Sequence, residues 1–118
     1  MSLSQAKQLY LFQAATTDST SVSINTFGYD AAVQVEVVET AGGTCTLQFN
    51  GSFDGKNWYV VGHQRVDNQA SPSRSVTAVS VTASLKAVYQ LLDPYPLYQA
   101  VITNSSSQTV NVRLYAVA

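Results

Sequence analysis

The sequence predicts an all-β protein, an antiparallel β-sandwich of about nine short strands with little helix. Several segments alternate apolar and polar residues, and a period of two is typical of strands that bury one face. Gly, Asn, Asp and Ser turns separate these segments at a spacing of roughly ten residues, which favours a sandwich or a barrel. Hydrophobic residues make up 46% of the 118 residues, enough for one core in one domain. Jelly-roll and immunoglobulin-like strand orders both fit this pattern.

The N-terminal part divides into an arm and the first strands. We expect residues 1–7, which are polar, to form a flexible N-terminal arm and residues 8–118 to form a single β-sandwich domain. The first strands are expected at residues 8–15, 20–25 and 31–39. The third is the strongest, because valines alternate with polar residues along it. A Gly-Gly pair at residues 42–43 then closes a hairpin, since glycine adopts the backbone angles that such turns require.

The clearest hairpin lies between residues 44 and 62. Before its turn the chain alternates, and Phe49 and Phe53 fall on the apolar side. Asp54 and Gly55 supply the turn, because glycine adopts positive φ at little steric cost. Trp58, the single tryptophan, follows the tip and is expected to cap the core and set the register of the sheet.

The second half of the chain continues the strand pattern. Residues 63–73 form the longest polar stretch and are expected to be a surface loop. Further strands are expected at residues 75–83, 97–103 and 109–117. Residues 85–92 are long enough for a short helix, but their composition favours a strand. Pro94 and Pro96 end it, because proline cannot donate to a ladder.

Charged residues are scarce, at 11% of the chain against about 25% in typical soluble domains. Such a surface suits a chain that contacts other proteins widely, since charge is depleted in interface cores. An extracellular β-domain with a Ser/Thr-rich face is the alternative. The formal charge is −1 and the six basic residues are scattered, so nucleic-acid binding is not expected. No apolar run is long enough to span a membrane and no signal peptide is evident, so no membrane partner is expected.

No catalytic constellation is evident, and we expect a protein that is not an enzyme and binds no cofactor and no metal. The single histidine, His63, lacks the partners of a catalytic triad in a recognisable motif and is expected to lie exposed in a loop. The seven acidic residues show no calcium-binding spacing. Cys45 is the single cysteine, which excludes an intrachain disulfide, and is expected to be buried.

Aromatic residues remain as candidates for a binding surface. Rings that would either form a sugar platform or fill the core are Tyr29, Trp58, Tyr59, Tyr89, Tyr95 and Tyr98. Three aromatic residues lie in expected loops, where contact with a partner competes with a place in the core. The candidate interface residues are Phe27, Tyr29, His63, Arg65 and Tyr95.

The segment 52–62, Ser-Phe-Asp-Gly-Lys-Asn-Trp-Tyr-Val-Val-Gly, resembles a hairpin found in two groups of proteins. One group comprises small β-sandwich virion proteins of tailed bacteriophages, including head decoration and other auxiliary structural proteins. In that group a Pro-Tyr-rich turn and two final strands follow the hairpin, and residues 93–101 and 109–118 resemble them. The other group comprises discoidin-like galactose-binding domains, which carry a similar Ser-x-Asp-Gly-x-x-Trp hairpin.

The phage resemblance is preferred, because few charges, no disulfide and no export signal suit a protein made in the host bacterial cytoplasm and packed onto a virion. It implies a capsid decoration protein that forms a homo-oligomer, often a trimer, and binds the major capsid protein or other virion subunits. Such a protein would stabilise the assembled shell by mass action. Residues 1–7, 27–30 and 63–73 are the expected contacts. A carbohydrate-binding module that takes a glycan, and a receptor-binding or tail structural subunit, are the alternatives.

Overall fold

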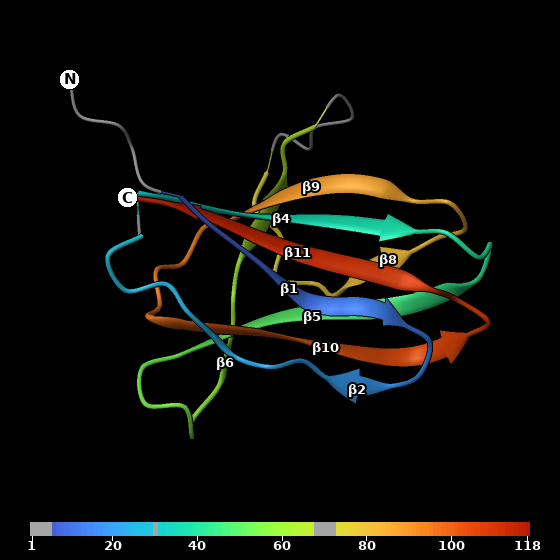
Figure 1. Ribbon diagram of the computed structural model, residues 1–118, viewed down its shortest axis with the longest axis horizontal. Coiled ribbons are helices and arrows are strands. Elements are labelled where there is room, and N and C mark those ends of the chain that lie inside the picture. The colour runs from blue at the N-terminus through green and yellow to red at the C-terminus, as the bar shows by residue number, and fades with distance from the viewer. Residues whose placement is uncertain (1–5, 30, 68–72) are drawn as a thin grey trace.

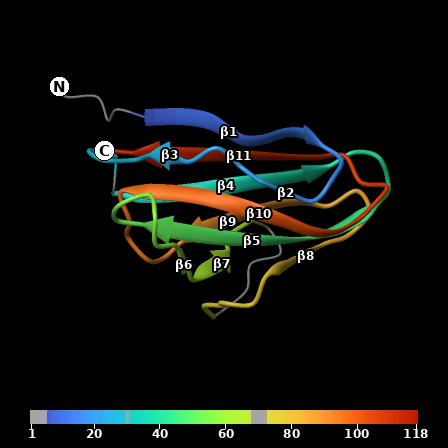
Figure 2. The ribbon, with the colours of Figure 1, turned by 90° about the horizontal axis from the view of Figure 1, so that it is seen from below.

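The computed structural model describes residues 6–29, 31–67 and 73–118, and within these ranges the chain forms eleven strands and no helix (Figure 1). The strands form two antiparallel sheets packed face to face, as the sequence predicts (Figure 2). The five-stranded sheet contains, in spatial order, β1 (Ala6–Ala15), β11 (Val110–Val117), β4 (Ala32–Glu39), β9 (Lys86–Leu91) and β7 (His63–Arg65). The six-stranded sheet contains β2 (Ser19–Thr20), β3 (Ile24–Asn25), β10 (Leu97–Ser106), β5 (Thr44–Ser52), β6 (Tyr59–Val60) and β8 (Val79–Val81).

The strand order is that of a jelly roll. Strands β1, β4, β9 and β11 alternate along the chain with strands of the other sheet, so most connections cross between the sheets. The first and last strands are neighbours, and β10 lies between β5 and the short β2 and β3. An immunoglobulin-like order places the first two strands in one sheet, so the jelly-roll alternative is correct. The count exceeds nine because the expected strand at residues 20–25 divides into β2 and β3, and because β7 forms within the expected loop at residues 63–73.

The core lies between the alternating inner faces of the long strands. Inward positions of β4, β5, β10 and β11 are almost fully buried, which confirms the predicted inner faces along most of their length. Three rings meet at the centre: Phe49 lies 5.5 Å from His63 and 6.1 Å from Tyr89, measured between ring centroids. Tilted and edge-to-face pairs of this kind stabilise a core beyond the area that they bury. Cys45 is buried, as expected.

Two residues of the expected N-terminal arm belong to the first strand. Ala6 and Lys7 pair with Val117 and Ala116, so both belong to β1 and to the sandwich. The Lys7 ammonium group donates a hydrogen bond to the carbonyl oxygen of Asn25 at 2.6 Å. The rest of the expected arm, residues 1–5, lies outside the described residues.

The expected surface loop at residues 63–73 begins with a strand, and this part of the prediction is wrong. His63, Gln64 and Arg65 pair with β9 as the edge strand β7, where the outer face tolerates polar side chains. Residues 68–72 of this loop lie outside the described residues, as does Asp30 of the expected contact at 27–30. Residues 86–91 form strand β9 rather than a helix.

Trp58 does not cap the core, and that prediction is wrong. The ladder between β5 and β6 contains only two pairs, Asn50 with Val60 and Gly51 with Tyr59. A six-residue loop, residues 53–58, therefore extends past the end of the sheet and carries Trp58 with it, half-buried and outside the core. The ring cluster of Phe49, His63 and Tyr89 occupies the core in its place.

A buried carboxylate, Glu39, ties together the loops at the end of the sandwich where β4 terminates. Glu39 is 2% exposed and accepts backbone hydrogen bonds from three separate turns, with donors at Ala41, Gly42, Gly43, Ser84 and Thr109. These hydrogen bonds, the one from Ser84 first among them, lower the pKa of Glu39 to about 2. Among the residues that the structure describes, the donors to this carboxylate are backbone amides, so Glu39 holds these loops together.

Candidate functional site

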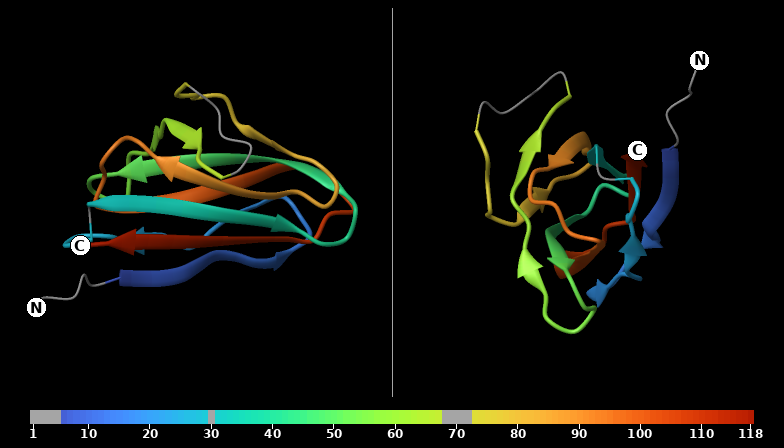
Figure 3. Two further views of the ribbon diagram at one scale, coloured as in Figure 1. Left: turned by 90° about the horizontal axis from the view of Figure 1, so that it is seen from above. Right: turned by 90° about the vertical axis from the view of Figure 1, so that its left-hand side faces the viewer.

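The opposite end of the sandwich gathers exposed aromatic side chains. We call Phe27, Phe53, Tyr59 and Tyr95 the aromatic end; they come from the loop before β4, the β5–β6 loop, β6 and the turn before β10. Phe27, Phe53 and Tyr59 are 83%, 70% and 51% exposed, whereas Tyr95 is half-buried. The C-terminus lies at the same end, and the right-hand view of Figure 3 looks onto it.

Tyr95 is the ring on which the aromatic end is assembled. Its centroid lies 5.0 Å from that of Phe53 and 6.2 Å from that of Tyr59, and the Tyr59 ring is nearly parallel to it. The ring lies against the backbone at Gly51, where any Cβ would overlap its atoms. The Tyr98 hydroxyl accepts a hydrogen bond from the Tyr95 amide and donates one to the carbonyl of Asp93. These two hydrogen bonds hold the Pro-Tyr-Pro turn, residues 94–96, in place.

The loop that carries Phe27 is held by its own hydrogen bonds. Thr26 donates its amide to the carbonyl of Pro96 and its hydroxyl to that of Tyr95, which binds this loop to the Pro-Tyr-Pro turn. The Phe27 amide donates to the Asn25 side chain, and Gly28 takes a φ of 84°. A cleft lies at this loop and the adjoining turn, lined by Thr26, Phe27, Pro94, Tyr95 and Pro96.

The β5–β6 loop that carries Phe53 is equally well ordered. The Asp54 carboxylate accepts hydrogen bonds from the amides of Lys56 and Asn57, and the Ser52 hydroxyl accepts from the Gly55 amide. These contacts, that from Asn57 first, lower the pKa of Asp54 to about 2. Gly55 has a φ of 77°, a backbone angle that glycine adopts at little steric cost.

The structure brings together three of the five candidate interface residues. Phe27 and Tyr95 line the same cleft, and Tyr29 donates its amide to Thr26 beside them. Tyr29 itself is partly buried against the core, with the Lys7 ammonium 6.0 Å from its ring centroid.

His63 and Arg65 lie elsewhere, on β7. The prediction of an exposed loop histidine is wrong, because His63 is buried between Phe49 and Tyr89. Burial lowers its pKa, although a backbone hydrogen bond to Val61 opposes this, and within the described residues its Nδ1 has no hydrogen-bond partner. Arg65 is ion-paired with Asp67 at 3.0 Å.

The expected sugar platform of six rings does not form. Tyr89 and Tyr98 are buried in the core, and their inward register positions on β9 and β10 account for this. Only Tyr59 and Tyr95 of that set belong to the aromatic end, with Trp58 on the adjacent loop. The aromatic end thus contains two of the six rings expected for that platform.

A second surface, on the outer face of the five-stranded sheet, was not anticipated from the sequence. One row of side chains crosses all five strands at matching register positions: Gln8, Tyr115, Gln34, Gln90 and Gln64. We call this surface the glutamine face. Alternation identifies each glutamine as outward, but the register that aligns them is set by strand pairing and cannot be read from the sequence.

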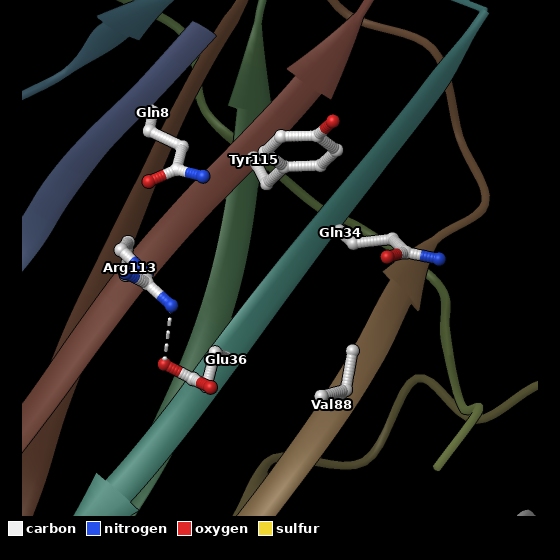
Figure 4. Close-up of a pocket in the computed structure, with 6 residues that line it drawn as sticks. All are labelled: Gln8, Gln34, Glu36, Val88, Arg113 and Tyr115. Atoms are coloured by element: carbon white, nitrogen blue, oxygen red, sulfur yellow. Dashed lines mark hydrogen bonds and ion pairs between the residues drawn. The ribbon is translucent and has the colours of Figure 1, made fainter. Parts of the chain in front are cut away.

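The glutamine face contains a shallow hollow. Its lining comes from four neighbouring strands and consists of Gln8, Gln34, Glu36, Val88, Arg113 and Tyr115 (Figure 4). Arg113 and Glu36 form an ion pair of 3.0 Å in the row next to the glutamines. The hollow therefore combines amides, a phenol and an internally neutralised charge pair.

In the parts of the chain that the structure describes, no group of three or more His, Cys, Asp or Glu side chains is placed to hold a metal ion. The same residues include no helix long and apolar enough to cross a membrane.

Comparison with known proteins identifies a fold relative. No protein-family model matches the sequence, and no curated protein matches it. Among solved structures, the crystal structure of the SPBc2 prophage-derived protein YomS is similar, with a TM-score of 0.72 and 9% sequence identity. The match covers 100% of this chain and 97% of that chain. At this identity the likeness establishes a shared fold.

Proposed function

We propose that this protein is a structural component of a tailed-phage particle, a capsid decoration protein that binds the assembled shell through the aromatic end. The observation that carries the proposal is the exposure of Phe27 and Phe53 on an end whose loops are fixed by hydrogen bonds. The shared fold with a prophage-derived protein, over nearly the full length of both chains, supports a phage origin.

The chemistry of the aromatic end favours a weakly charged protein surface as its partner. Aromatic side chains dominate the energetics of protein interfaces, and charge is depleted at their centres. The Asp54 carboxylate accepts hydrogen bonds within its own loop, so part of its hydrogen-bonding capacity is satisfied without a partner. Because hydrogen bonds already hold these loops in one conformation, binding does not carry the entropic cost of ordering them.

In this proposal the protein stabilises the shell by mass action. A ligand that binds the assembled state and not the free subunits shifts the equilibrium towards assembly, and many copies on a repeating lattice add avidity. The major capsid protein is the proposed partner. The protein performs no catalysis in this role. It associates as a homo-oligomer, with a trimer as the expected state, and sedimentation velocity measures the oligomeric state.

Quantitative mass spectrometry of purified particles tests the proposal. Particles from cells that carry the gene are expected to contain the protein at a copy number that matches a repeating shell lattice. The double variant Phe27→Ser/Phe53→Ser is expected to be depleted from particles. The control Gln99→Ala, a change on the outer face of the six-stranded sheet, is expected to retain wild-type occupancy. A much smaller copy number would point to a tail subunit, and absence from particles would refute a virion role.

A further inference from the structure

The hollow on the glutamine face presents hydrogen-bond donors and acceptors side by side. Gln8, Tyr115 and Gln34 occupy matching positions on three neighbouring strands, about 4.8 Å apart. Neither amide, nor the Tyr115 hydroxyl, forms a hydrogen bond with any residue that the structure describes, so all three groups are available to a ligand. Arg113 and Glu36 hold each other in place beside them, so the floor is ordered before a ligand arrives.

The charge and backbone of this surface exclude several classes of ligand. Arg113 and Glu36 sum to zero charge, so an anion would meet the carboxylate and a cation would meet the guanidinium. A peptide cannot add as a strand here, because β11 and β4 are paired on both sides. A purely apolar ligand would leave the amides of Gln8 and Gln34 without hydrogen-bond partners.

We propose that the glutamine face binds a neutral saccharide, with one sugar ring seated in the hollow between Tyr115 and the Arg113–Glu36 pair. Each sugar hydroxyl both donates and accepts, as do the side-chain amides of Gln8 and Gln34. The apolar C–H face of the ring packs on Tyr115, which is 38% exposed. The row of glutamines spans about 19 Å over four inter-strand spacings, so an oligosaccharide lies across the sheet. This function is independent of the shell contact proposed for the aromatic end.

An NMR titration of the full chain tests the inference. Maltohexaose, cellohexaose and fully N-acetylated chitohexaose, three neutral probes of different linkage and substitution, are added to ¹⁵N-labelled protein. At least one is expected to shift the side-chain amides of Gln8 and Gln34 and the backbone amides of β4 and β11, with a dissociation constant of about 1 mM or below.

Two variants and a matched control locate the site. Gln34→Ala is expected to weaken binding roughly three- to tenfold, the value of one hydrogen-bonding group. Tyr115→Val keeps a strand-favouring residue but removes the ring, and is expected to abolish measurable binding. Gln99→Ala removes an outward amide from the other sheet and is expected to leave affinity unchanged. Spectral dispersion confirms that each variant is folded. If Tyr115→Val does not fold, Gln34→Ala alone locates the site.

Three results would overturn the inference. The first is the absence of any shift with all three oligosaccharides at about 10 mM, well above the expected dissociation constant. The second is a set of shifts confined to the aromatic end, which would place the sugar there instead. The third is equal weakening by Gln34→Ala and Gln99→Ala, which would indicate non-specific association with amide-rich surfaces.

Discussion

The position of Phe49 and Phe53, four residues apart on the same strand and its continuation, allows a matched test of where the core ends. Phe49 is 1% exposed and lies 5.5 Å from His63 and 6.1 Å from Tyr89, so Phe49→Ala removes a central ring and both ring contacts. Buried Phe→Ala changes cost about 3–5 kcal/mol, and we expect the upper half of that range. Phe53 is 70% exposed, so Phe53→Ala is expected to cost less than about 1 kcal/mol.

These free energies of unfolding correspond to measurable shifts in melting temperature. At about 2.1 cal/mol/K per residue, the 118-residue chain has an unfolding entropy near 0.25 kcal/mol/K. Phe49→Ala should therefore lower the melting temperature by roughly 16–20 °C and Phe53→Ala by less than about 4 °C. Urea denaturation followed by circular dichroism, with calorimetry for the melting temperature, measures both. Equal destabilisation by the two variants would refute the assignment of Phe53 to a surface patch.

Three further predictions concern the carboxylate of Glu39, the ring of His63 and the contact at Gly51. The folded pKa of Glu39 is about 2 and its ordinary value is 4.5, so its contribution to stability is full above pH 4.5 and is lost as the pH drops towards 2. Glu39→Gln should therefore lower the urea midpoint and flatten this dependence on acid. A pH profile equal to that of the wild type would contradict the prediction. Burial lowers the pKa of His63, so the unfolded state binds the proton more tightly and stability should decline as the pH falls below 6.5; melting curves of His63→Phe should lack this step. Gly51→Ala should displace the Tyr95 ring at a cost of about 1–3 kcal/mol, and wild-type stability with unshifted Tyr95 resonances would contradict the packing.

Periodicity predicted the fold because β4, β5, β9 and β11 bury every second residue along nearly their whole length. Val33, Val35 and Val37 alternate with polar residues on β4, and the turn at Gly55 needs a backbone angle that glycine supplies. Where the pattern failed, tertiary structure overrode it. Phe53 continues the apolar alternation of β5, but the ladder ends at Ser52, so its ring is exposed.

The two surfaces differ in how far the sequence anticipated them. Phe27 and Tyr95 were identified as candidates because they are aromatic residues in turn-rich segments, and the structure places them at one cleft. The glutamine face depends on register across five strands, which local sequence does not encode. Glu39 was also missed, although a carboxylate at the inward end of β4, just before a Gly-Gly turn, is the signal that marks it.

Photo-crosslinking from Phe27 tests the central claim, that the aromatic end is the surface by which this protein attaches to a particle. Phe27→p-benzoylphenylalanine places a reactive group at the most exposed ring of that end, and Gln99→p-benzoylphenylalanine serves as the control on the outer face of the six-stranded sheet. Irradiation of assembled particles is expected to join the protein to the major capsid protein from position 27 and not from position 99. Crosslinks from position 99 alone, or none from position 27 on particles that carry the protein, would contradict the account.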